Sequence, residues 1–150
     1  GWESETPGPS PFVDYLEWTG TQDIAAYLAV PAAIDFQATH DWEQMRLACH
    51  ELVREVRQRI NGLTGLASIC PDAPEWFRQM AAIRLPACDT VALKARLWDE
   101  WRVEAPIITW NGEPFVRVSV QAYNDQADIE RLIAALTALL PVVQAPAPNG

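Results

Sequence analysis

The residue of this sequence that most clearly indicates a binding role is Arg117, which lies towards the C-terminal end. Residues 116–124 read VRVSVQAYN, so alternation along a strand would place Arg117, Ser119 and Gln121 on one face and the three valines on the other. The valine face suits a core, which leaves Arg117 on a half-buried strand in need of a partner. Because a guanidinium can donate two parallel hydrogen bonds to a carboxylate, Arg117 either binds an acidic ligand or forms an internal salt bridge.

A second candidate is the turn Thr19-Gly20-Thr21, which places a flexible glycine between two hydroxyls. We expect a helix to begin at residue 21. The free amides and the positive dipole end of a helix N-terminus favour a phosphate group. The same three residues also suit a plain N-cap turn without any ligand, and the sequence leaves both interpretations open.

Nucleophilic, metal and Schiff-base sites find little support. His40 and His50 lie ten residues apart and would point in different directions on a helix, so surface or capping roles are expected for both. No group of His, Cys, Asp and Glu has the spacing of metal ligands. The three cysteines include no CxxC pair, which argues against a disulfide framework and fits a reducing, cytoplasmic compartment. The single lysine, Lys94, lies among acids and Arg96 and is expected to be a solvated helix residue.

Length and charge exclude further classes of protein. A chain of 150 residues with 49% hydrophobic residues can bury roughly 70% of its unfolded surface as one domain. Its formal net charge of −9 repels phosphate backbones and anionic lipid. No apolar run reaches the roughly 18 residues of a membrane span. We therefore expect neither nucleic-acid nor membrane binding.

Alternating helices and strands are expected to position these residues. Helices are predicted over 21–39 with a kink or split at Pro31, from Asp41 to the stop at Asn61-Gly62, over 89–101, and from Asn124 or Asp125 to about 140. Strands are predicted over 66–70, 79–85, 103–110 and 115–121, the last two joined by an Asn111-Gly112 hairpin turn. This order implies an α+β fold, with a three- to four-stranded, mainly antiparallel sheet and helices packed on one face. Residues 1–11 are expected to be an extended lead-in and residues 141–150 a flexible tail.

The two motifs, taken in this order, resemble the small C-terminal domain of the class V aminotransferases, fold-type-I enzymes that use pyridoxal phosphate. Residues 12–23, FVDYLEWTGTQD, look like the family's Gly-Thr stretch ahead of a long helix. Arg117, Ser119, Tyr123 and Asn124, followed by an acidic helix start, look like its C-terminal signature. In local sequence, the isopenicillin N epimerase-like branch is the most similar, on the segments WTGTQD, EAPI and WNG. The resemblance covers roughly residues 10–140 and implies a small domain over 12–140.

The resemblance also implies roles for individual residues. Thr21, next to Gly20, would contact the phosphate of pyridoxal phosphate, in this family typically that of the partner subunit in a homodimer. Arg117 would bind the α-carboxylate of an amino-acid substrate. The Schiff-base lysine, the aspartate under the pyridine nitrogen and the stacking aromatic residue would belong to a large domain that precedes this one. The chain would then be part of a longer enzyme and inactive alone.

The reaction itself stays open between transamination, epimerisation and lysis. Cysteine desulfurases resemble this family and carry a nucleophilic cysteine ahead of the arginine strand. Residues 103–116 contain no cysteine and Cys88 lies too far upstream, so sulfur transfer is disfavoured. The alternative to the enzyme interpretation is a stand-alone, non-enzymatic module whose acidic surface and tryptophans contact a partner.

Overall fold

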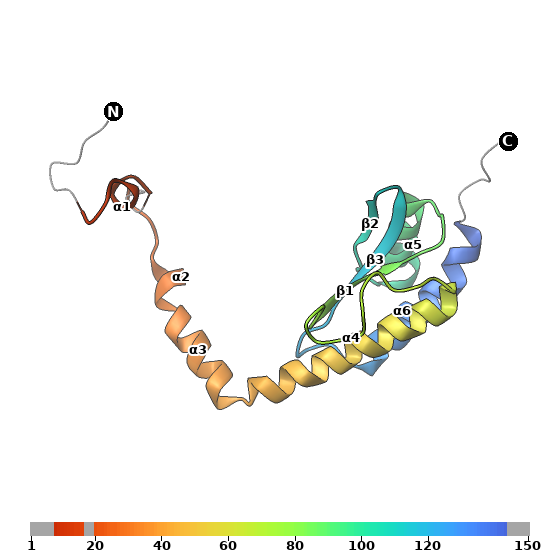
Figure 1. The fold of residues 1–150 in the computed structure, drawn as a ribbon, viewed down its shortest axis with the longest axis horizontal. Helices are drawn as coiled ribbons and strands as arrows, with labels where there is room; N and C mark the ends of the chain where they lie inside the picture. The colour runs from red at the N-terminus through yellow and green to blue at the C-terminus, as the bar shows by residue number, and fades with distance from the viewer. Residues whose placement is uncertain (1–7, 17–19, 144–150) are drawn as a thin grey trace. The chain divides into compact units, whose positions relative to one another are not determined.

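The computed structural model describes residues 8–16 and 20–143, which belong to two compact units, Gly1–Asp41 and Trp42–Gly150 (Figure 1). The described part of the first unit holds three short helices, α1 (Pro11–Leu16), α2 (Ala25–Leu28) and α3 (Val30–Thr39). The predicted split of the 21–39 helix is confirmed, because α2 and α3 are separate and Pro31 lies in the first turn of α3, where a missing N–H is tolerated. The helical stretch begins at Ala25 rather than at residue 21.

The second unit contains the sheet and the remaining helices. Its elements are α4 (Trp42–Thr64), β1 (Met80–Arg84), α5 (Thr90–Trp101), β2 (Ile107–Trp110), β3 (Glu113–Ser119) and α6 (Gln126–Leu139), followed by the 3-10 turn η1 (Leu140–Val142). The three strands form one antiparallel sheet in the order β1-β3-β2. Helix α4 contacts β1, α5 contacts β2, and α6 packs against both helices, so the predicted α+β fold with helices on one face is confirmed (Figure 1).

The central strand β3 is held in register on both sides. Its pairs with β1 run from Met80↔Ser119 to Arg84↔Phe115, and its pairs with β2 run from Ile107↔Val116 to Trp110↔Glu113. The predicted hairpin turn joins β2 to β3, with positive φ values of 50° at Asn111 and 77° at Gly112. Two successive positive φ values match the twist of the flanking strands, which is why Asn-Gly is favoured there.

The predicted strand over residues 66–70 is wrong. This stretch is irregular, and the sheet has three strands within the described residues. The buried guanidinium of Arg57, on α4, donates to the backbone carbonyl of Cys70. A side chain from α4 therefore satisfies a polar group that a neighbouring strand would otherwise have to satisfy.

Two predicted helix boundaries also need correction. Helix α4 continues through Asn61-Gly62 and ends at Thr64, before Gly65, whose φ of 70° is the left-handed conformation common after a helix. Asp41 has a φ of 48° instead of the extended backbone of an N-cap. Asp89 does cap α5 as predicted, since its Oδ1 accepts from the amides of Val91 and Ala92 at 3.0 and 2.9 Å.

A single core lies between the sheet and the helices. The buried residues of α4 recur at helical spacing, and they meet the inward valines of β3 and apolar residues of α5 and α6. The members with at most 1% exposure in this cluster are Val53, Val56, Ile60, Leu93, Leu97, Val116, Ala135, Leu136 and Leu139. Full burial of each large side chain stabilises the fold by about 1.5–3 kcal/mol. This core fixes β3 so that its alternate residues face away from the helices.

The chain remains folded beyond α6. Val143 is buried, and its carbonyl accepts from the amide of Asp89 at 2.8 Å. Residues 1–7 and 144–150 lie outside the described residues, so the extended lead-in and the flexible tail stay predictions there. Over the described ranges, none of the helices has both the length and the apolar character needed to cross a bilayer.

Candidate functional site

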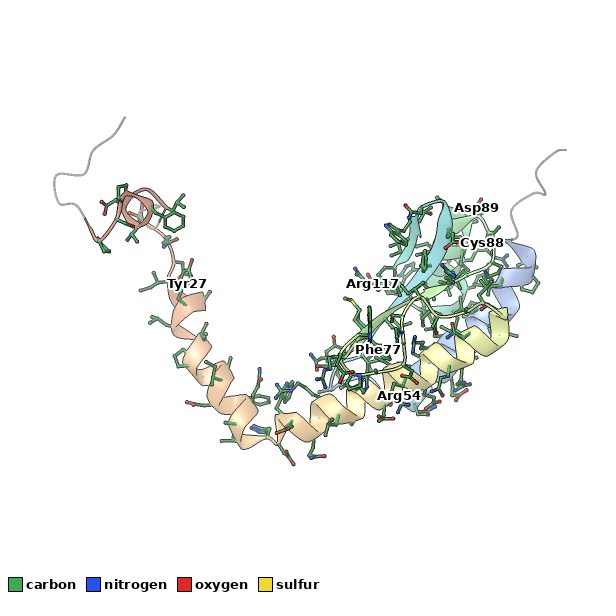
Figure 2. The ribbon with its side chains drawn as sticks, in the orientation of Figure 1. Tyr27, Arg54, Phe77, Cys88, Asp89 and Arg117 are labelled. Atoms are coloured by element: carbon green, nitrogen blue, oxygen red, sulfur yellow. The ribbon has the colours of Figure 1, made fainter. Side chains whose placement is uncertain are left out.

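Arg117 lies on the face of β3 that points away from the core (Figure 2). Its neighbours Val116 and Val118 are buried, whereas Arg117 is exposed, as the alternation predicts. Its backbone amide donates to the carbonyl of Pro106 at 2.9 Å. Its guanidinium has no hydrogen-bond or ion-pair partner among the described residues. The internal salt bridge left open by the sequence is therefore not formed with any described acid.

A cavity of about 410 Å³ lies beside this arginine. The pairing of β2 with β3 stops at Ile107↔Val116, so the C-terminal part of β3 has no strand on that side. The cavity is bounded there by residues 102–106, by residues 117–120 and by the first half of α6. Arg117 and Ser119, which the sequence placed on one face, both line it.

The other polar residues of the predicted motif have structural tasks. The Oε1 of Gln121 accepts from Gln79 Nε2 at 3.1 Å and from the Ala122 amide at 3.0 Å. Asn124 lines the cavity, but its Oδ1 accepts from the Gln121 amide and its Nδ2 donates to Asp128. These bonds fix the turn between β3 and α6. They thereby hold the first half of α6 beside the end of β3.

Cationic side chains outnumber anionic ones around the cavity. Arg102, Arg117 and Arg131 line it together with Glu104 and Asp128, so the formal charge is three minus two, or +1, in a chain whose net charge is −9. Arg102 and Arg131 were missed by the sequence reasoning. The residues around Arg131 follow an apolar helical pattern. This pattern predicts a helix packed on the core and gives no sign of a binding residue. The signal that could have found it is the spacing of Asp125 and Asp128, which marks Asp128 as a capping residue and leaves Arg131 without a local acid.

The Gly20-Thr21 turn belongs to the first unit. Gly20 has a φ of 80°, a left-handed conformation that glycine adopts without steric cost. Thr21 is exposed, and α2 begins four residues later at Ala25, whose amide donates to the Oδ1 of Asp23 at 2.8 Å. The expectation that Thr21 stands at a helix N-terminus is therefore wrong. Trp18 and Thr19 of the same motif lie outside the described residues.

The two histidines have structural partners. His40 Nδ1 lies 2.7 Å from the Phe36 carbonyl oxygen, and its ring stacks on Phe36, in keeping with a capping role. His50 is buried, with Nδ1 2.9 Å from the carbonyl oxygen of Arg78 and its ring against Phe77. The predicted surface or capping role is wrong for His50, because it joins α4 to the segment before β1.

Neither the cysteines nor the lysine has the surroundings of a catalytic nucleophile. Cys49, Cys70 and Cys88 are free thiols, and no group of three potential metal ligands exists among the described residues. Burial raises the pKa of the Cys88 thiol, and the charge of Asp89 raises it further, which disfavours the reactive thiolate. Lys94 is exposed on α5, so it lacks the desolvation that keeps a covalent-catalysis lysine uncharged.

Comparison with known proteins identifies similar sequences and a similar fold. The isopenicillin N epimerase of Amycolatopsis lactamdurans is 40% identical over 125 residues, which are 83% of this chain and 31% of that protein. The isopenicillin N epimerase of Streptomyces clavuligerus is 36% identical over 88% of this chain and 33% of its own length. A probable chloroplastic L-cysteine desulfhydrase of Arabidopsis thaliana is 31% identical over 82% of this chain and 29% of its length. The chain thus spans about a third of the length of these curated relatives.

The fold comparison agrees with the sequence comparison. An 8-amino-7-oxononanoate synthase from Francisella tularensis superposes with a TM-score of 0.63 at 10% identity, covering 87% of this chain and 38% of that one. No family model matches the chain. The relatives belong to pyridoxal-phosphate-dependent enzyme families, and the fold is that of a small domain of a fold-type-I enzyme. The chain is therefore similar, over more than four fifths of its length, to the isopenicillin N epimerases, which are class V-like pyridoxal-phosphate enzymes, as its motifs indicated.

Proposed function

We propose that the chain is the substrate-binding small domain of a pyridoxal-phosphate enzyme that acts on an amino acid, and that Arg117 binds the α-carboxylate. The observation that carries this proposal is the exposed guanidinium of Arg117, without a described acid beside it, at the wall of the 410 Å³ cavity. Two charge-assisted bonds from one planar group would fix both the position and the rotation of the carboxylate. The orientation of the bonds at Cα would follow from that fixed plane.

The described residues fit a contact with the cofactor rather than its covalent attachment. The hydroxyl of Thr21 is exposed and has no partner among the described residues, so it can donate to a phosphate oxygen. Lys94 is exposed and unsuited to covalent attachment. When bound, pyridoxal phosphate supplies an electron sink for charge that develops at Cα. The chain alone is accordingly proposed to be inactive, and whether the enzyme transaminates, epimerises or cleaves its substrate would depend on groups outside it.

The proposed partners are a large domain of the same protein and a second subunit. The first unit supports this proposal, because no residue of α2 or α3 is buried. Tyr27, Leu28 and Ile34 expose 66%, 70% and 62% of their surfaces. Exposed apolar side chains in such number are typical of a surface that another protein part covers. Three free thiols support a reducing, cytoplasmic location.

The test is an Arg117→Gln substitution in the longer enzyme of which this chain is proposed to be part. Loss of a charge-assisted pair worth about 1.5–3 kcal/mol should lower kcat/KM for amino acids by roughly 10- to 150-fold. The absorbance of bound pyridoxal phosphate should stay unchanged, because Arg117 is not assigned to the cofactor. Arg78→Gln is the matched control, since the Arg78 guanidinium also lacks a described partner but lies outside the cavity. An unchanged kcat/KM in Arg117→Gln would refute the assignment, as would a loss of folding that explains the whole effect.

A further inference from the structure

The cavity beside Arg117 contains a second arginine that no described residue pairs with. Arg131 lines the same cavity from α6, and its guanidinium has no acceptor among the described residues. Its neighbours Ile129 and Leu132 are buried at 3% and 5% exposure, so this part of α6 is fixed against the core. Arg131 therefore projects from a rigid helix, whereas Arg117 projects from the strand at another wall of the cavity.

The acid at helical ion-pair spacing from Arg131 is already engaged. Asp128 lies three residues earlier on α6, the spacing at which helical ion pairs form. Its Oδ2 instead accepts from Asn124 Nδ2 at 3.1 Å and from the backbone amide of Asp125 at 3.3 Å, which completes the capping box of α6. The capping box thus holds this carboxylate at the helix start and leaves Arg131 unpaired.

The size and charge of the cavity fit a ligand with more than one anionic group. Its volume of about 410 Å³ lies within the roughly 300–1,000 Å³ typical of small-molecule sites. Of the three guanidinium groups that line it, that of Arg102 donates to the Trp98 carbonyl and lies over the Trp98 ring, so those of Arg117 and Arg131 remain available to a ligand. A single carboxylate on Arg117 would leave Arg131 unused at the same cavity.

We propose that this cavity binds an amino acid whose side chain ends in a second carboxylate, with the α-carboxylate on Arg117 and the distal carboxylate on Arg131. The assignment of the first carboxylate rests on the proposed function. The second follows from Arg131 itself, whose planar donors match a carboxylate in two-point contact. Arg131 is then a specificity-determining residue that selects acidic side chains over neutral ones of the same shape.

The experiment titrates the 150-residue chain, labelled with ¹⁵N, with L-glutamate and L-glutamine, which differ only by a carboxylate in place of an amide. The dissociation constants and the shifts of the arginine Nε–H signals are followed by NMR. We expect the chain to bind glutamate at least about tenfold more tightly than glutamine, the ratio that one charge-assisted contact supplies. The Nε–H signals of Arg117 and Arg131 should both move with glutamate, and that of Arg117 alone with glutamine.

Three variants separate the possible outcomes. Arg131→Gln should abolish the preference for glutamate and leave glutamine binding unchanged, whereas Arg131→Lys, which keeps the charge but not the planar fork, should retain part of the preference. Arg117→Gln should weaken both ligands, and Arg78→Gln neither. Equal binding of the two ligands by the unaltered chain, or a preference that survives in Arg131→Gln, would overturn this inference while leaving the proposed role of Arg117 intact. Unchanged glutamine binding by Arg117→Gln would instead overturn the proposed function and the two-point binding that rests on it.

Discussion

Two regions of the second unit use arginine in opposite ways. Along α4, Arg54 donates through Nε to Asp72 Oδ1 at 3.0 Å, and Arg59 donates to both Glu55 and Glu130. Around the cavity, Arg117 and Arg131 have no acceptor among the described residues. The chain has 20 acidic residues against 11 basic ones, so a shortage of acids does not explain the difference. A structural arginine and a binding arginine therefore differ in whether groups of the fold pair with the guanidinium.

The α4 region also shows what a structural arginine looks like when it is buried. Arg57 is 4% exposed, donates to the Cys70 carbonyl, lies 3.6 Å from Asp72 and places its guanidinium carbon 4.7 Å from the centre of the Phe77 ring. Its guanidinium is therefore held by a hydrogen bond, an ion pair and a ring contact within the fold. Its burial leaves it out of reach of a ligand, in contrast to Arg117.

The largest effect that tests this comparison is expected from Arg57→Met. The change leaves the Cys70 carbonyl without its donor and removes one cation from Asp72, so the free energy of unfolding should fall by about 2–4 kcal/mol. The measurement is the urea unfolding midpoint, which reports stability as long as the slope of the unfolding free energy against urea concentration is unchanged. Arg54→Met is the matched control, because its side chain is 36% exposed and its loss should be clearly smaller. Equal losses in the two variants would show that burial does not distinguish these arginines.

Much of the fold could be predicted because it depends on local pattern. Asp89 and the Asn111-Gly112 pair mark a helix start and a hairpin that the structure confirms. The failures arise where distant groups decide the outcome. The apolar run at 66–70 has strand composition, but Arg57 takes the carbonyl of Cys70. Gly62 costs α4 about 1 kcal/mol relative to alanine, and the helix continues through it to end at Thr64.

The candidate site was predicted in part for the same reason. Strand alternation alone places Arg117 and Ser119 away from the core, and both line the cavity. The cavity itself depends on where β2 stops pairing with β3, which is a property of two strands and the segment before them. Arg131 enters the site only because α6 packs beside that open edge. No spacing along the sequence connects residues 117 and 131, so only the assembled fold brings them to one cavity.

A smaller effect should appear when the α4 region is titrated with acid. Hydrogen bonds from Arg59, and then from Gln126, lower the pKa of Glu130 from 4.5 to about 2. Because the folded state has the lower pKa, the contribution of this carboxylate to stability is present above pH 4.5 and is lost as the pH falls towards 2. The unfolding midpoint should therefore be higher for the unaltered chain than for Glu130→Gln near pH 6, and the difference should disappear near pH 2. Glu104→Gln, which alters a carboxylate without a described partner, serves as the control, and a difference independent of pH would contradict the role of the Arg59 contact.

The smallest effect on stability is expected for the two arginines of the cavity, and this prediction tests the comparison most directly. Arg117→Met and Arg131→Met remove guanidinium groups that bind no described acid, so each should change the free energy of unfolding by no more than about 0.5 kcal/mol. Removing a cation also makes the net charge of −9 more negative, so neither substitution should raise the stability. Urea midpoints measured beside those of Arg57→Met provide the scale. A loss comparable to that of Arg57→Met would mean that Arg117 or Arg131 supports the fold, and an arginine that supports the fold is not free to select a substrate.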